Sequence, residues 1–355
     1  MNKKSALILL AFGTALSIAF LSTYCLAAEF KPVTLKYSHY VAQTSWHGEL
    51  NQWWANEVEK RTGGKVKVKI FWMDSLTKIK DGLPSVQSGM AEMGWISSTY
   101  HPSQLPLFLV LDNVFNFGDD YVSSVMAITD AMENEPNLKA ELERENIIQV
   151  IPHCSGHAQI GSKKIMSLAD LKGKTLRTYG GSRTNYYTNL GANPIFMAFP
   201  DLYEAMDRGT IDAIGDMAVV LASGFKLYEV CKTVLLINAG GSLASGGFMN
   251  LKVFKGLPPD IQKTLLDLRR DYGAKMAQKE SDDEVKYYKE WNTKHGVTIK
   301  GLSPEEQKIN VEAGKAAQEA FIKQQESKGA PAARKVWDYY MAARLKHEAE
   351  RAKKK

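Results

Sequence analysis

The chain has 355 residues, of which 45 are Lys or Arg and 39 are Asp or Glu, so its formal net charge is +6. This length exceeds what one ordinary hydrophobic core supports and predicts about two domains. The excess positive charge lies at the two ends, in the lysines at 3–4 and in the tail 344–355, which is most simply a solvated terminus. Basic and aromatic residues do not alternate along the chain, so the composition does not favour a nucleic-acid partner.

The first 28 residues have the order of a secretory signal peptide: two lysines, a mostly apolar run over 6–21, and small residues ending at Ala28. We therefore expect cleavage near Ala28 and a soluble, exported protein in the periplasm. A membrane span is one alternative, because the run is near the lower length limit for one. Lipidation at Cys25 is another, but Tyr24 argues against it, because a lipoprotein signal has a small residue there.

The mature N-terminus predicts a strand, a helix and a second strand. Residues 33–38 alternate as a strand does, and Thr44 or Ser45 can cap a helix that stops at Gly63. Residues 65–70 then place apolar side chains on one face and lysines on the other, which is typical of a half-buried strand. This order predicts a βαβ unit and a sheet with at least one parallel strand pair.

Two segments of the chain resemble each other, which indicates two similar lobes. In 86–94 and in 206–215 a helix ends at a glycine, an acidic residue follows three positions later, and an apolar strand comes next. The match places Trp95 and Asp216 at equivalent strand ends, the edge where open α/β sheets bind ligands.

Beyond Pro258 the chain is predicted to be helical. Ser303 to Glu306 form a capping box with proline at the first helical position, leading a helix to about Gln325. A last helix over 332–351 has Val336, Tyr339, Tyr340 and Leu345 at core-like spacings. The glycine-rich segment 240–247 is predicted to let strands cross between the lobes.

Signatures of catalysis and metal binding are weak. The chain has no His-Glu-x-x-His helix, no Gly-x-Ser-x-Gly elbow and no Cys-x-x-Cys pair. Five histidines in the first half raise a metal hypothesis, but ordinary hydrogen-bonding or ligand-contacting roles are favoured over it; they are His39, His47, His101, His153 and His157. Cys154 and Cys231 are left after signal removal, and a disulfide and two buried free thiols both remain open. We expect no enzyme activity, no metal and no cofactor.

The stretch from Ser167 to Gly215 contains the most specific motif. It reads Asp-Leu-Lys-Gly-Lys-x-Leu-Arg, then Leu-Gly-Ala-x-Pro, then Leu-Tyr-Glu-Ala-Met-x-x-Gly-x-x-Asp-Ala. This pattern resembles the solute-binding proteins of tripartite ATP-independent periplasmic (TRAP) transporters, the DctP-type family, and the resemblance runs from about Thr34 to about Gln262. It implies an α/β protein of the two-lobed periplasmic binding type (type II-like), with mixed sheets, a ligand cleft and long C-terminal helices.

The resemblance also implies domain bounds and a site. We expect a signal peptide over 1–28, a first lobe over 29–150 completed by part of 240–260, a second lobe over 151–240, and helices over 258–355 that pack across both. In this family the arginine that matches Arg177 forms the main salt bridge to the substrate carboxylate, and a planar guanidinium suits that role. The other residues expected to bind the ligand are His157, Asp216, Phe199, Trp95, Tyr40, Trp46, Ser97 and Tyr100.

The ligand class follows from departures from the family pattern. His157 stands where several relatives carry a second arginine, and Asp216 lies near a ligand-binding asparagine of the family. Without the second arginine, a monocarboxylate with an aromatic or apolar body is favoured over a C4-dicarboxylate or another organic acid. Asp216 then offers a partner for an ammonium, an indole N–H or a hydroxyl group. Trp46 fits the buried stripe of its helix equally well.

The partners implied are the small and large membrane permease subunits, to which a closed monomeric receptor delivers its ligand. An exported enzyme and a binding protein that feeds a membrane sensor are the alternatives.

Overall fold

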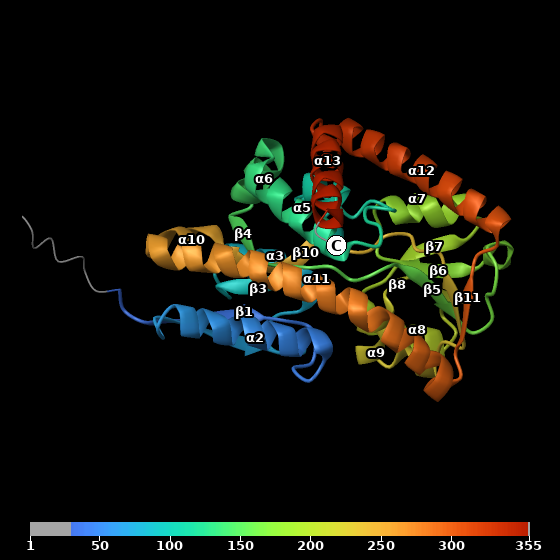
Figure 1. Ribbon diagram of the computed structural model, residues 1–355, viewed down its shortest axis with the longest axis horizontal. Coiled ribbons are helices and arrows are strands. Elements are labelled where there is room, and N and C mark those ends of the chain that lie inside the picture. Colours follow the sequence, from blue (N-terminus) through green and yellow to red (C-terminus); the bar gives the residue numbers. More distant parts are fainter. Residues whose placement is uncertain (1–29, 354–355) are drawn as a thin grey trace, which may run out of the picture.

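Two separate β-sheets organise the chain into two lobes (Figure 1). The computed structural model describes residues 30–353, so the expected signal peptide lies outside the described residues. Among residues 30–353, none of the helices has the length and apolar character needed to cross a bilayer.

The first sheet has the strand order β2-β1-β3-β10-β4. Its strands are β1 (Val33–Ser38), β2 (Val66–Phe71), β3 (Met93–Ser97), β4 (Ile147–Pro152) and β10 (Ser245–Asn250). β1 is parallel to β2 and β3, whereas β10 is antiparallel to β3 and β4. The βαβ prediction is confirmed, because α2 (Trp46–Arg61) joins β1 to β2 and the side chain of Ser45 caps it at Gly48 N.

The second sheet has the order β11-β9-β5-β8-β6-β7 and is also mixed. Its strands are β5 (Gln159–Ser162), β6 (Thr175–Thr178), β7 (Asn193–Phe196), β8 (Ala213–Met217), β9 (Thr233–Leu236) and β11 (Thr298–Gly301). β11 departs from the all-helical prediction beyond Pro258. It adds to the sheet edge by pairing in parallel with β9.

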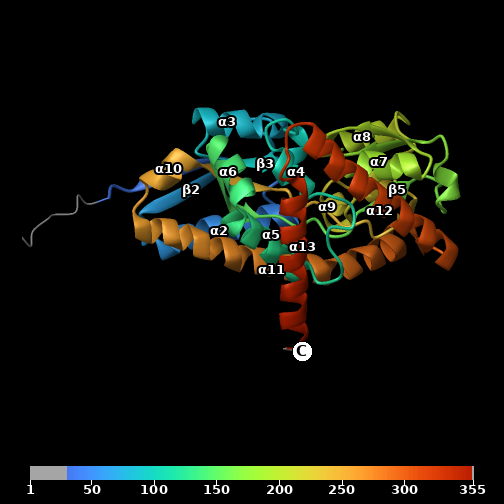
Figure 2. The same cartoon turned by 90° about the horizontal axis from the view of Figure 1, so that it is seen from above.

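Helices surround both sheets (Figures 1 and 2). The shorter ones are α3 (Gly82–Ser88), α4 (Pro106–Val110), α5 (Tyr121–Asn134), α6 (Pro136–Arg144), α7 (Ser182–Asn189), α8 (Leu202–Asp207), α9 (Val219–Gly224) and α10 (Leu251–Gly256). The 37-residue helix α11 (Pro259–His295) contacts α2, α5 and β4 in the first lobe and α9 and β11 in the second. Together with the segments 153–158 and 237–244, it joins the lobes, as a hinge requires.

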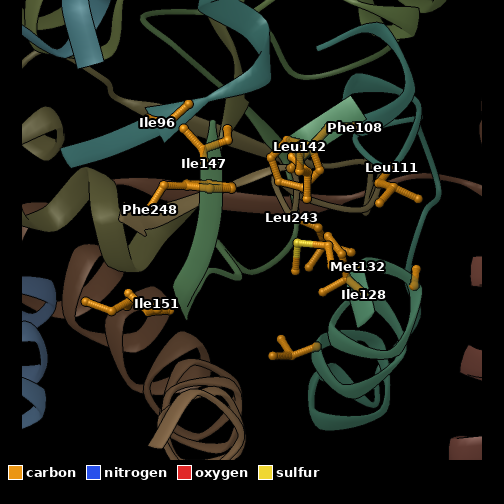
Figure 3. Packing of buried hydrophobic residues seen from close by; sticks show 14 of the residues in the cluster. Ile96, Phe108, Leu111, Ile128, Met132, Leu142, Ile147, Ile151, Leu243 and Phe248 are labelled. Carbon is orange, nitrogen blue, oxygen red and sulfur yellow. The ribbon is translucent and has the colours of Figure 1, made fainter. Parts of the chain in front are cut away.

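Each lobe has its own core. In the first lobe, Phe248 of β10 and Ile151 of β4 pack in the same cluster as Ile128 and Met132 of α5 (Figure 3). In the second lobe, neighbouring strand residues belong to two different clusters: Leu235 to one and Val234 to the other. Successive strand side chains point to opposite faces, so the second sheet is covered on both faces.

The last two helices are close to their predicted bounds. The capping box of Ser303 and Glu306 is present, and it begins α12 (Pro304–Ser327). In α13 (Ala333–Ala352), Val336 and Tyr340 are buried as predicted. The prediction that Leu345 belongs to the core is wrong, since it is 56% exposed, and Tyr339 also lies among the exposed residues. The C-terminal end of α13 projects from the body of the protein (Figure 2), and Leu345 lies on a side of the helix that faces solvent, whereas His347 and Arg351 on this half bond to Asp130 and Asp120 at α5.

The two remaining cysteines, Cys154 and Cys231, are both buried and free, which decides the open question of their pairing. Burial raises the pKa of the Cys231 thiol to about 12.

Candidate functional site

A cavity of about 60 Å³ lies between the two lobes. Strands β3, β6 and β8 contribute Trp95, Ser97, Arg177 and Asp216 to its lining, and Tyr40, Tyr100 and Phe199 lie in the segments around them. The structure therefore brings together seven of the nine predicted site residues. The cavity lies by the carboxyl ends of strands, where open α/β sheets characteristically bind ligands.

Arg177 is buried in β6 without an acidic partner. Its Nε donates a hydrogen bond to the carbonyl oxygen of Met197 at 2.9 Å, and its Nη1 donates one to that of Gly215 at 3.3 Å. No carboxylate within residues 30–353 forms a salt bridge with it, and its side chain is among the largest fully buried ones. Burial lowers the pKa of the Arg177 guanidinium, and the more distant Asp216 opposes this shift. Since burying an unpaired charge is unfavourable, this guanidinium is suited to accept an anion.

Asp216 has a different role from the one expected. Its Oδ1 accepts hydrogen bonds from Arg183 Nη1 at 3.4 Å and Tyr187 Oη at 2.9 Å. Its Oδ2 accepts them from Thr178 Oγ1 at 2.6 Å and from the backbone N–H of Tyr179 at 3.2 Å. The expectation that this carboxylate is free to pair with a ligand ammonium is therefore wrong. Both oxygens are already engaged, and Asp216 acts as the buried counter-charge of Arg183.

An aromatic cluster forms the first-lobe side of the cavity. The ring of Trp95 lies 4.7 Å from that of His39, 5.0 Å from that of His153 and 5.8 Å from that of Tyr40. Burial lowers the pKa of His39 and of His153 to about 3, so both imidazoles are neutral at neutral pH. Trp95, Tyr40 and His153 line the cavity as uncharged rings, and His39 packs behind them. Among residues 30–353, Arg177 is the one lysine or arginine of the lining.

Two aromatic pairs cross from one lobe to the other beside this cavity. Tyr40 and Phe225 have ring centroids 6.5 Å apart at an interplanar angle of 20°. Tyr100 and Phe196 are 5.8 Å apart and edge to face. Each pair includes one residue of the cavity lining, Tyr40 or Tyr100, so the lobes touch each other beside the Arg177 cavity.

Two predicted site residues lie outside the cavity. His157 packs between Phe117 and Tyr121, with ring centroids 5.2 and 5.3 Å away, close to the joining segments. It was expected to contact the ligand, but it does not line this cavity. Burial lowers its pKa to about 4, and its Nε2 lies 3.7 Å from Asp119 Oδ1, beyond hydrogen-bond distance. Trp46 lines a neighbouring cavity instead, and its Nε1 donates a hydrogen bond to Asp283 Oδ2 at 2.7 Å.

The sequence analysis missed residues that the structure places at the site. Arg183 lies in the same stretch as Arg177 but outside the matched motifs, and no signal in the sequence pointed to its pairing with Asp216. His153 was not among the predicted site residues, although it lines the cavity. Within residues 30–353, no group of three or more His, Cys, Asp or Glu side chains is arranged to hold a metal ion.

A two-lobed α/β protein with a cavity between its lobes, and an unpaired cation within that cavity, has the architecture of a periplasmic solute-binding protein. A family model described as bacterial extracellular solute-binding protein, family 7, matches residues 37–325, and the chain belongs to this family. The family consists of extracytoplasmic solute-binding receptors, and the TRAP resemblance is confirmed.

The chain is similar to several curated and solved proteins. It is 28% identical over 260 residues to a solute-binding protein of Verminephrobacter eiseniae, covering 71% of this chain and 74% of that one. It is 27% identical over 287 residues to the C4-dicarboxylate-binding periplasmic protein of Rhodobacter capsulatus, covering 79% and 84%. Among solved structures, a marine metagenome TRAP solute-binding protein specific for aromatic acid ligands, in complex with 3-hydroxybenzoate, is 21% identical with a TM-score of 0.79. That alignment covers 89% of this chain and 99% of the other, and it shows the shared fold.

Proposed function

We propose that this protein is an exported receptor of a TRAP transporter that binds an organic monocarboxylate with an aromatic or apolar body. The ligand carboxylate binds Arg177, the lobes close over it, and the closed form delivers it to the small and large membrane permease subunits. Closure by hinge motion agrees with the separate cores of the lobes and with the aromatic pairs that cross between them.

The observation that carries this proposal is the buried guanidinium of Arg177, which has no acidic partner among residues 30–353 and lies in the lining of the inter-lobe cavity. A carboxylate ligand supplies the missing counter-charge and can accept two parallel hydrogen bonds. Because Arg177 is the one lysine or arginine in the described lining, a second ligand carboxylate finds no cation there. This favours a monocarboxylate over a diacid.

The aromatic lining supports an apolar or aromatic ligand body. Trp95, Tyr40 and Phe199 present ring surfaces to the cavity. Solved relatives of the same fold were crystallised with 3-hydroxybenzoate, with benzoate and with pyroglutamate, all of them compact acids. A C4-dicarboxylate-binding relative supports the diacid alternative, which the charge of the lining opposes.

Replacing Arg177 tests the proposal. We expect R177A to weaken the binding of an aromatic acid such as benzoate or phenylacetate by roughly thirty- to several-thousand-fold, since losing one buried charged partner typically costs about 2–5 kcal/mol. R177K is expected to fail as well, because an ammonium cannot reproduce the bidentate geometry. Calorimetry on folded variants measures both effects.

The matched control is Arg208→Ala, because Arg208 is exposed and pairs with Glu204 on the surface of the second lobe. It is expected to leave affinity unchanged. If R177A binds the acid within about threefold of the unmodified protein, Arg177 is not the carboxylate site. Mass spectrometry of ligand released from the purified protein then identifies which acid it retains.

A further inference from the structure

A second and larger cavity adjoins the Arg177 cavity. Its volume is about 360 Å³, against about 60 Å³ for the first. It lies between the first-lobe segment that leads into α2, the second-lobe helix α9 and the C-terminal part of α11. We call it the aromatic chamber, because Trp46, Tyr228, Tyr287 and Trp291 line it.

More of the chamber's lining is apolar than polar, and the polar atoms of its two indoles are already bound. Trp46 Nε1 donates to Asp283 Oδ2, and Trp291 Nε1 donates to Ser223 Oγ, each at 2.7 Å. The acidic lining residue Glu290 forms an ion pair with Lys294 at 3.1 Å. A hydrocarbon or aryl group is therefore the chemistry that this chamber would accept.

Tyr40 stands between the two cavities. It and Leu221 line both of them, so they form the boundary that the cavities share. The ring of Tyr40, from the first lobe, meets that of Phe225, from the second. Phe225 is held in turn by Phe199, whose ring lies 5.1 Å away and lines the Arg177 cavity.

We propose that Tyr40 and Phe225 are specificity-determining residues that limit the length of the ligand, by closing the Arg177 cavity off from the aromatic chamber. This inference rests on the proposed function, since it takes Arg177 as the fixed point from which length is measured. As long as the rings of Tyr40 and Phe225 are in contact, an acid whose carboxylate binds Arg177 must fit within the smaller cavity. A longer arylalkanoate would need the space that they fill.

The test compares acids of increasing length on the full-length mature protein. Benzoate and phenylacetate represent compact acids, and 4-phenylbutyrate represents an acid whose ring would reach into the chamber. We expect the unmodified protein to prefer the compact acids. Since one methylene group in a hydrophobic pocket changes affinity by about 10–200-fold, Y40A is expected to shift this preference toward 4-phenylbutyrate by about tenfold or more. F225A removes the same boundary from the other lobe and should shift it in the same direction.

The matched control is Tyr228→Ala, a tyrosine of the chamber that stacks on His295 with ring centroids 3.8 Å apart and does not line the Arg177 cavity. It enlarges the chamber but leaves the boundary intact, so it should not change the length preference. Equal weakening of all acids by Y40A and F225A, or a shift as large in Y228A, overturns the inference.

The failure of this inference can be told apart from that of the proposed function. If compact acids bind in an Arg177-dependent manner and Y40A and F225A leave the length preference unchanged, only the length limit is refuted. If no acid in the panel binds through Arg177, the receptor proposal fails and the length limit fails with it.

Discussion

The buried pair of Arg183 and Asp216 allows a sharp prediction about stability. Replacing Asp216 with Asn removes one charge and keeps the size of the side chain. The backbone of Asp216 has a φ of +54°, in the left-handed region, which Asn tolerates better than most residues. The substitution therefore tests the charge without adding backbone strain, whereas Ala would add strain at this positive φ.

The size of the effect follows from the surroundings of Arg183. Both side chains are fully buried, so D216N leaves the guanidinium without its counter-charge. Removing one partner of a buried ion pair typically destabilises a protein by about 3–5 kcal/mol. The Arg183–Asp216 contact is long, at 3.4 Å, and Arg183 also donates to the carbonyl oxygens of Ala239 and Gly241 at 3.0 and 3.2 Å. We therefore expect a loss near the lower end, about 3 kcal/mol.

Urea unfolding followed by circular dichroism measures this loss, with the slope of the transition as a check that the unfolded states are comparable. Asp212→Asn is the matched control: Asp212 is exposed in the same lobe and accepts one hydrogen bond, from Thr175 N at 2.9 Å. Its variant should stay within about 0.5 kcal/mol of the unmodified protein.

Two results would refute this reasoning. A loss below about 1 kcal/mol in D216N, no larger than an ordinary substitution, would mean that Arg183 does not depend on Asp216. If D216N has an unchanged free energy of unfolding but binds an amino acid more weakly, relative to its deaminated analogue, Asp216 contacts the ligand.

Two further predictions concern pH. Burial lowers the pKa of His39 and of His153 to about 3. The stability that their neutral forms support is therefore fully present above the unfolded pKa of about 6.5. It is lost as pH falls toward 3. In urea unfolding between pH 6.5 and 4.5, H153Q should lose less stability than the unmodified protein, by up to about 1.4 kcal/mol per pH unit; parallel curves would contradict this. Burial raises the pKa of Glu280, whose two carboxyl oxygens have no hydrogen-bond partner in the described part of the chain. The stability that its protonated form supports is therefore present below the unfolded pKa and is lost as pH rises above it. The stability of E280Q relative to the unmodified protein should therefore rise from pH 4.5 to pH 8, and a constant difference would show that Glu280 is ionised in the folded state.

Much of the local structure could be predicted from the sequence, because it depends on residues close together in the chain. The alternation of residues 33–38 and 65–70 predicted two strands, since one face of each must be buried. The helix between them predicted a βαβ unit with a parallel strand pair, which β1 and β2 form. The capping box of Ser303 and Glu306 predicted the start of α12, because its hydrogen bonds span three residues. The family motif placed Arg177 in a short strand, which is β6.

The tertiary structure alone decided which side chains meet. Trp46 bonds to Asp283, far along the chain, and so lies in the aromatic chamber instead of the Arg177 cavity. Asp216 is engaged by Arg183, and His157 packs among aromatic rings near the joining segments. No local pattern encodes these partners, because hydrogen-bond and packing partners from distant elements are set by how the two lobes and α11 come together. The sequence by itself thus determined the strand that carries Arg177, whereas the packing of the lobes determined that Arg177, and not Arg183, is the arginine without an acidic partner.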